Sequence, residues 1–308
     1  MGEEYVDQHY VPQGYLKRFG RKNTNNNGYH VAVKRKDNKS KKKYYPKAVD
    51  EIAYEKYLYD VSYLDDPKYW EHYFCNEIEP LYGDTLTNII ARIILSGFEN
   101  YILSDLEREQ LSLMLVFQFA RVPSFFKTKV AKGPNICKEV KKEVIEKYNS
   151  LISKEQKYII ESFEPEKDFA KNVILETISA GDYLNKFIDV LKEGVFLLYY
   201  NETELPFYTS DNPVVLYNYM TKSLKYIDNG IANSSTIIYY PLSPKVMLRV
   251  VPKGYKLLGL DIIDGSVYVL KTNVKDFSFV CTVNDLQIEH ATSEVYIPPQ
   301  FLEDFNLM

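Results

Sequence analysis

Three short segments combine residue types that could build one reactive site. His9–Phe19 holds one of only four histidines in the 308-residue chain. Gln118–Pro123 places an amide and a guanidinium in apolar surroundings, and Ser210–Pro213 reads Ser-Asp-Asn-Pro. Histidine, carboxylate, amide and guanidinium groups serve acid–base catalysis and anion binding. We therefore expect these distant segments to converge in one site.

Gln118 and Arg121 lie three residues apart, so they share one face of a helix. Their neighbours are apolar, and buried polar groups must find partners or water. In one interpretation, Arg121 binds an anionic group such as phosphate while Gln118 orients a neighbouring polar atom of the substrate. In the other, Arg121 pairs with a structural carboxylate and stabilises the helix end. The sequence leaves both interpretations open.

Asp211 and Asn212 lie between two expected strands. Pro213 biases Asn212 towards an extended conformation, and both residue types suit a tight turn. A functional role would make Asp211 a general base or metal ligand, with Asn212 orienting substrate. A simple strand-connecting turn is the commoner role of such a sequence.

His9 could act as a general base or a ligand, although a hydrogen-bonded packing role is more frequent for a histidine in such surroundings. Glu77 and Glu79 are two residues apart on an expected helix, so they point in different directions. We expect Glu77 to face solvent and Glu79 to turn inward. Glu79 and Asp211 would then hold a divalent metal ion or activate water. Tyr15 completes the set as a substrate-binding residue.

Positive charge is concentrated near the N-terminus. The segment from Lys17 to Lys47 has twelve Lys or Arg residues and one acidic residue, a charge of +11 in a chain whose net charge is −4. The rest of the chain therefore carries −15. Lys41, Lys42 and Lys43 could follow a nucleic-acid backbone. A solvated hairpin tip is the usual alternative for such a run.

Composition indicates a globular intracellular protein. Hydrophobic residues make up 45% of the chain, enough for a core. Cys75, Cys137 and Cys281 are few, odd in number and widely spaced, which fits a reducing compartment rather than a disulfide framework. The polar N-terminus is unlike a secretory signal, and no apolar stretch is long enough for a membrane span. We expect a cytoplasmic protein without a membrane partner, and a homo-oligomer is compatible with the sequence.

The elements that must position these residues form three regions of one expected compact domain (1–308). Residues 1–65 predict irregular structure with a basic hairpin, 66–194 show helical spacing, and 195–308 contain β-branched and aromatic runs separated by turn residues. Ser104 and Glu107 form a capping box that predicts a helix over 105–121, ended by Pro123. Because helices and strands are segregated, we predict an α+β fold with a mainly antiparallel C-terminal sheet.

These residues also carry a family resemblance. The chain resembles the prokaryotic domain of unknown function 4238 (DUF4238), and the resemblance covers nearly its whole length. The matching positions are His9, Val11, Pro12, Tyr15, Leu16, Phe19, Ile78, Glu79, Gln118, Arg121, Pro123, Ser210 to Pro213, Pro241 to Pro244, Asn284, Ala291, Val295 and Tyr296. Gly14 departs from the pattern, where a bulky residue is expected. The resemblance implies no activity.

The usual catalytic and cofactor signatures are absent from the sequence: it contains no GxGxxG, GxxxxGK[ST], HExxH, CxxC or GxSxG motif. The leading hypothesis is a bacterial hydrolase acting on a phosphate-containing substrate such as nucleic acid or a nucleotide, with a divalent metal ion as the expected cofactor. A role as an effector in defence against phages is a conceivable setting. The competing hypothesis is a non-catalytic ligand- or partner-binding protein whose polar cluster is a buried structural network.

Overall fold

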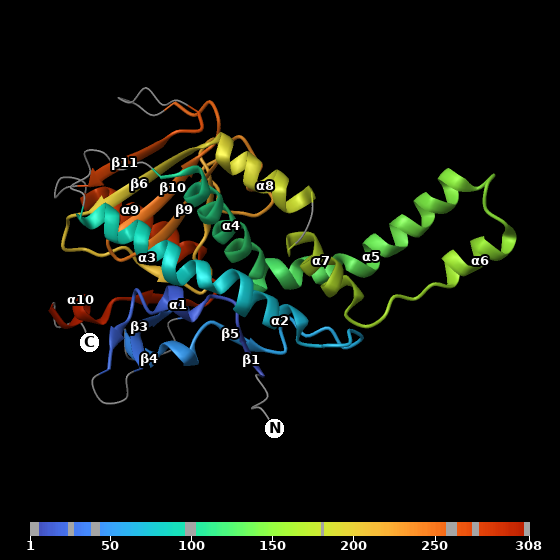
Figure 1. Cartoon of the computed structure of the whole chain (residues 1–308), viewed down its shortest axis with the longest axis horizontal. Helices are drawn as coiled ribbons and strands as arrows, with labels where there is room; N and C mark the ends of the chain where they lie inside the picture. The colour runs from blue at the N-terminus through green and yellow to red at the C-terminus, as the bar shows by residue number, and fades with distance from the viewer. Residues whose placement is uncertain are drawn as a thin grey trace.

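Figure 1 shows the computed structural model of the chain. It describes residues 6–23, 28–37, 44–95, 103–179, 182–256, 264–272 and 277–304. Strands dominate the N-terminal part, helices the middle and a large sheet the C-terminal part, so the predicted α+β class is confirmed.

The N-terminal region contains the predicted hairpin. Its elements are short: β1 (Asp7–His9), α1 (Gln13–Leu16), β2 (Arg21–Lys22), β3 (Tyr29–Arg35), β4 (Tyr45–Ala48), η1 (Val49–Glu51) and β5 (Tyr54–Lys56). Strands β3 and β4 pair antiparallel, and β1 pairs antiparallel with β5, which sets His9 opposite Tyr54. The His9 segment is thus held as a strand.

A strand from the far end of the chain completes this region. Strand β12 (Glu294–Ile297) pairs antiparallel with β3 on one side and with β7 (Thr209–Ser210) on the other. Its residues Val295 and Ile297 are buried. This pairing brings the Ser-Asp-Asn-Pro segment to the N-terminal sheet.

The helical region follows the predicted pattern. Its elements are α2 (Tyr69–Tyr73), η2 (Phe74–Ile78), α3 (Glu79–Leu95), α4 (Asp105–Arg121), α5 (Pro123–Tyr148), α6 (Lys154–Ser162), α7 (Phe169–Ser179) and α8 (Asp182–Glu193). The capping box is present: Glu107 N donates to Ser104 Oγ over 3.2 Å, and Ser104 N donates to Glu107 Oε2 over 2.9 Å. Helix α4 has the predicted bounds. Helix α5 begins directly after α4, because Pro123 both ends α4 and suits the first turn of a new helix.

The large sheet has the strand order β11-β6-β10-β9-β8. Its strands are β6 (Val195–Asn201), β8 (Val215–Asn218), β9 (Thr236–Ser243), β10 (Val246–Val251) and β11 (Val267–Thr272). All pairs are antiparallel except β11 with β6, which is parallel. The prediction of a mainly antiparallel sheet is therefore confirmed.

The sheet is covered on both faces. Successive residues of β6 point to opposite faces of the sheet. On one face, Phe196 and Leu198 join the main hydrophobic core with the central helices. On the other face, Val195 and Leu197 pack in a second cluster with Val280 of α9 (Phe277–His290). Helix α9 lies within the region expected to be β-rich and was not predicted. The last element of the described residues is α10 (Pro299–Asp304).

Helices α5 and α6 extend away from the rest of the molecule, as Figure 1 shows. Helix α6 has no buried residue, and α5 has one, Phe126. Within the described ranges, no helix is long and apolar enough to cross a lipid bilayer.

The junction between α8 and β6 gives the first prediction. A Cβ at Gly194 would lie 2.6 Å from the carbonyl oxygen of Val251, the residue paired with Val195 in the sheet. We expect Gly194→Ala to cost about 1–3 kcal/mol of unfolding free energy through this clash. Gly83→Ala on α3 is the control, because nothing lies within 4 Å of its Cβ position; it should be neutral or stabilising by about 0.5–1 kcal/mol. Urea unfolding of both variants tests this, and equal stabilities would contradict it.

Candidate functional site

The guanidinium of Arg121 is the centre of a buried polar network. Arg121 is the last residue of α4 and only 1% exposed. Its Nη2 donates to the His9 carbonyl over 2.7 Å and to Glu79 Oε1 over 3.2 Å. Its Nε is 3.4 Å from the Tyr59 hydroxyl, and its Cζ lies 4.3 Å from the centre of the Phe74 ring. Arg121 thus joins β1, the segment after β5, the α2–α3 helix and α4.

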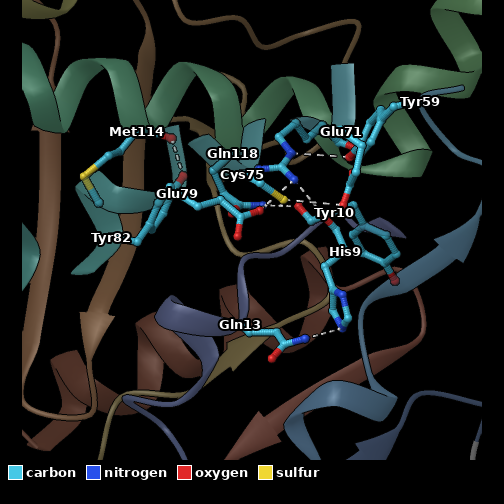
Figure 2. Close-up of polar contacts among 11 residues, drawn as sticks. His9, Tyr10, Gln13, Tyr59, Glu71, Cys75, Glu79, Tyr82, Met114 and Gln118 are labelled. Atoms are coloured by element: carbon cyan, nitrogen blue, oxygen red, sulfur yellow. Dashed lines mark hydrogen bonds and ion pairs between the residues drawn. The ribbon is translucent and has the colours of Figure 1, made fainter. Parts of the chain in front are cut away.

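A π-helical turn shapes the acidic side of this network. Residues 74–78 form η2 between α2 and α3, so the helix accommodates one wide turn at this point. Such turns occur frequently at functional sites. Here the turn contains Phe74, which stacks under Arg121, and Cys75, while Glu71 precedes it and Glu79 follows it. Figure 2 shows Glu71, Cys75 and Glu79 grouped with His9 and Gln118.

Glu71 is a member of the site that the sequence reasoning missed. Burial raises the pKa of Glu71 from 4.5 to about 7, with Arg121 opposing the shift and the charge of Glu79 adding to it. Its Oε1 accepts from the Cys75 thiol over 3.7 Å, and its Oε2 has no hydrogen-bond partner within the described part of the chain. Glu71 can therefore exchange a proton near neutral pH.

Glu79 and Glu77 lie as expected. The Glu79 side chain is 26% exposed and ion-paired with Arg121, whereas Glu77 faces solvent. The Nη1 atom of Arg121 finds no partner among the described residues. The network therefore presents a paired carboxylate, a second carboxyl group with a raised pKa and one guanidinium nitrogen that no described residue bonds.

The His9 ring and Gln118 border the network. Burial lowers the pKa of His9, with the charge of Glu79 opposing the shift, so the imidazole is mainly neutral at pH 7. Its Nε2 is 3.4 Å from Gln13 Nε2. Gln118 donates from Nε2 to the Tyr10 carbonyl over 3.0 Å, and its Oε1 lacks a partner in the described ranges. Gln118 thus fixes the backbone next to His9.

The structure gives Asp211 a different environment. Its Oδ1 accepts from the Thr292 backbone N–H over 2.8 Å. Its Oδ2 accepts from the Ser293 N–H and hydroxyl, both over 2.7 Å, and from the Glu294 N–H over 3.1 Å. Burial raises the pKa of Asp211, and these hydrogen bonds oppose the shift. Both carboxylate oxygens thus hold the turn before β12, and Asp211 makes no hydrogen bond to Glu79 among the residues that the structure describes.

Two further predicted residues, Tyr15 and Asn212, lie apart from the network. Tyr15 is fully buried: its hydroxyl is 2.6 Å from the Pro241 carbonyl and its ring stacks on Tyr240 at 5.3 Å. It links α1 to β9 inside the core and has no surface for a substrate. Lys41, Lys42 and Lys43 lie outside the described residues. Asn212 lines a separate pocket together with His290.

No group of three His, Cys, Asp or Glu side chains suited to a metal ion occurs among the residues that the structure describes. The three cysteines are free thiols.

The fold and the site define an α+β protein with a buried arginine–carboxylate network. The chain belongs to the family described as "Protein of unknown function (DUF4238)", whose model matches residues 7–300. The predicted membership is therefore confirmed. Comparisons with curated proteins and with solved structures gave no match.

The raised pKa of Glu71 predicts a pH dependence of stability. A folded-state pKa of about 7 against 4.5 means that the folded protein binds more protons than the unfolded chain between these pH values. This stabilisation is complete below pH 4.5 and is lost as pH rises through about 7. At about 1.4 kcal/mol per pKa unit, the loss is at most about 3.5 kcal/mol. Glu71→Gln should remove this part of the pH dependence, so that the variant gains stability over the parent as pH rises. Urea unfolding between pH 4.5 and 8 tests this, and parallel curves would contradict it.

The contacts of Asp211 give a further prediction. Asp211→Asn would turn an amide NH2 towards backbone N–H donors, so we expect a loss of about 1–3 kcal/mol of unfolding free energy. Asp285→Asn, on the exposed side of α9, is the matched control and should change little. Thermal unfolding of the two variants tests the capping role. An Asp211→Asn melting temperature equal to that of the parent would contradict it.

Proposed function

We propose that this protein is a hydrolase acting on a phosphate-containing substrate, with Glu71 and Glu79 as its carboxyl pair beside Arg121. The observation that carries the proposal is the contrast between the two glutamates. Glu79 is ion-paired with a guanidinium, whereas Glu71 has a pKa of about 7. Pairs of carboxyl groups in such different environments are typical of acid–base catalysis.

Each group has a chemical role in this scheme. Glu71 would donate a proton to the leaving group and recover it, because its pKa is close to physiological pH. The buried positive charge of Arg121 would stabilise, through its electric field, the negative charge that develops on the phosphoryl group. Glu79 would orient the attacking water, and the neutral His9 ring could accept its proton. Substrate would approach from the side of Glu79 and Cys75, since Arg121 itself is buried.

We also propose that a divalent metal ion assists the reaction, and the assays below therefore include one. Glu71 and Glu79 carry the carboxylate oxygens that Mg²⁺ and Mn²⁺ prefer. Asp211 is left out, because both of its carboxylate oxygens already accept hydrogen bonds. A cytoplasmic location, nucleic acid as substrate and a role in phage defence would be compatible with this activity.

A second candidate function is non-catalytic binding, with the network as a structural element. The observation that favours it is the burial of Arg121, whose four interactions join separate parts of the chain. Removing one partner from a buried ion pair costs several kcal/mol, so such a network can serve folding alone.

Hydrolysis assays on Glu71→Gln distinguish the two functions. The substrates are p-nitrophenyl phosphate, bis(p-nitrophenyl) phosphate, nucleoside triphosphates and single-stranded RNA and DNA, each with Mg²⁺, with Mn²⁺ and with EDTA. Loss of the proton-transfer group should lower kcat by about 100-fold or more without loss of stability. Glu77→Gln, an exposed glutamate of the same helical segment, is the matched control and should retain full activity. Activity unchanged in Glu71→Gln, or no hydrolysis of any of these substrates by the parent, would refute the proposal in favour of the structural network.

A further inference from the structure

A second polar site lies beside the start of α5. It is an open pocket of about 620 Å³, lined by Asn212, the segment 221–228 and the C-terminal end of α9 with His290. Ser124, at the start of α5, also lines it. We refer to it as the Asn212 pocket. Its volume lies in the range usual for small-molecule sites.

Asn212 contributes an acceptor that no described residue satisfies. The residue is 2% exposed, and its Nδ2 donates to the Tyr226 hydroxyl over 3.1 Å and to the His290 carbonyl over 3.4 Å. A carbonyl can only accept, so these contacts fix the orientation of the amide. The remaining polar atom of the amide, Oδ1, is therefore an acceptor that is buried and has no hydrogen-bond partner in the described ranges. An amide oxygen in this state needs a donor.

His290 contributes a second acceptor. Its ring makes a hydrogen bond to the Val214 backbone, while burial lowers its pKa to about 4. The ring is therefore neutral at pH 7. Nε2 has no partner among the residues described, so Nδ1 is the nitrogen that donates to Val214. In a neutral imidazole the other nitrogen, Nε2, then carries a lone pair.

The support behind these two side chains is rigid. Gln287 Nε2 donates to the Asn212 carbonyl over 3.0 Å, and the Asn212 N–H donates to Ser210 Oγ over the same distance. Asp211 fixes the neighbouring turn through the contacts described above. The two acceptors are thus held in place before any ligand arrives, which reduces the entropic cost of binding.

The rim has a different character. Lys222 and Lys225 are exposed cations, while the Nζ of Lys36 is held by the Glu289 and Ala291 carbonyls. Two acids also line the pocket: Glu289, and Asp228, which accepts from the Ser223 hydroxyl over 2.6 Å. With His290 neutral, three lysines against two acids leave a net charge of +1. The aromatic ring of Tyr226 is 38% exposed and offers a stacking surface.

We propose that the Asn212 pocket binds a nucleotide, with an amino-bearing edge of the base donating to Asn212 and His290 and the phosphate meeting Lys222 and Lys225. Adenine, cytosine and guanine carry exocyclic amino groups, whereas uracil carries none and has carbonyl oxygens as its only exocyclic groups. Two acceptors without donors disfavour a carbonyl oxygen, because it is an acceptor itself and can donate no hydrogen bond to them. The inference concerns binding at a site separate from Glu71 and stands whether or not the protein is a hydrolase.

Calorimetric titration of the full chain tests the proposal with AMP, CMP, GMP and UMP. At least one of the first three should bind, and UMP should bind about tenfold more weakly or less, a difference of about 1.4 kcal/mol. Adenosine, cytidine and guanosine test the contribution of the base, and inorganic phosphate tests that of the anion.

Three variants locate the binding. The double change Lys222→Glu and Lys225→Glu should weaken the nucleotide by about tenfold or more and leave its nucleoside unchanged, because only the phosphate meets the rim. His290→Leu should weaken both. Lys186→Glu on α8, outside the pocket, is the control for reversal of a surface lysine charge and should behave as the parent. Since the rim lysines are exposed, the double variant remains informative if His290→Leu fails to fold.

Four outcomes would overturn the proposal: no binding of any nucleotide at millimolar concentration, equal affinity for UMP, inorganic phosphate binding as tightly as the nucleotide, or full binding by the double rim variant. Glu71→Gln should bind nucleotide as the parent does. Failure of the hydrolase assay with intact nucleotide binding would therefore reject the proposed activity alone.

Discussion

The burial of one guanidinium is the constraint on which the arrangement of the chain depends. A charged group taken out of water costs several kcal/mol unless it is paired and hydrogen-bonded. Arg121 meets this requirement with the His9 carbonyl, the Glu79 carboxylate, the Tyr59 hydroxyl and the Phe74 ring. These partners come from parts of the chain that share no local structure, so the interaction is complete only when the N-terminal strands have packed against the helices.

The acidic side of the network is a consequence of that burial. The wide turn of η2 places an aromatic ring under the guanidinium and a thiol next to Glu71. One glutamate takes the ion pair, and the other is left in a poorly solvated place where its charge is disfavoured. The same geometry that stabilises Arg121 therefore creates a group that exchanges protons near neutral pH.

The second polar centre, around Asp211 and Asn212, is built from side chains that hold backbone groups in place. Asp211 binds the backbone of the turn before β12, and Gln287 holds the strand end that carries Asn212. These residues position others rather than face solvent. Their effect is to fix Asn212 and His290 at the wall of an open pocket whose rim is basic. The two centres are connected through Tyr226, which contacts the Asn212 amide and packs near Phe119 at the end of α4.

Local signals in the sequence determined much of the fold. The Ser104–Glu107 capping box and Pro123 delimit α4, because these signals act through neighbouring backbone groups. The β-branched runs in residues 195–308 likewise predicted the strands of the large sheet. Helix α9 was missed, although Val280, Val283, Asn284 and Gln287 follow a helical spacing that longer-range pattern analysis could have found. Its β-branched and aromatic residues mask that spacing.

The candidate site could be predicted only in part. The sequence singled out Arg121, Gln118, Glu79 and His9, because polar residues in apolar segments need partners. It could not assign Glu71, since its raised pKa depends on the π turn and on the packing around Arg121. It also could not show that Asp211 binds a turn 81 residues later in the chain. Residue types and spacing determine which groups must be satisfied, whereas the tertiary structure decides which partner satisfies each group, because those partners are brought together only by long-range packing.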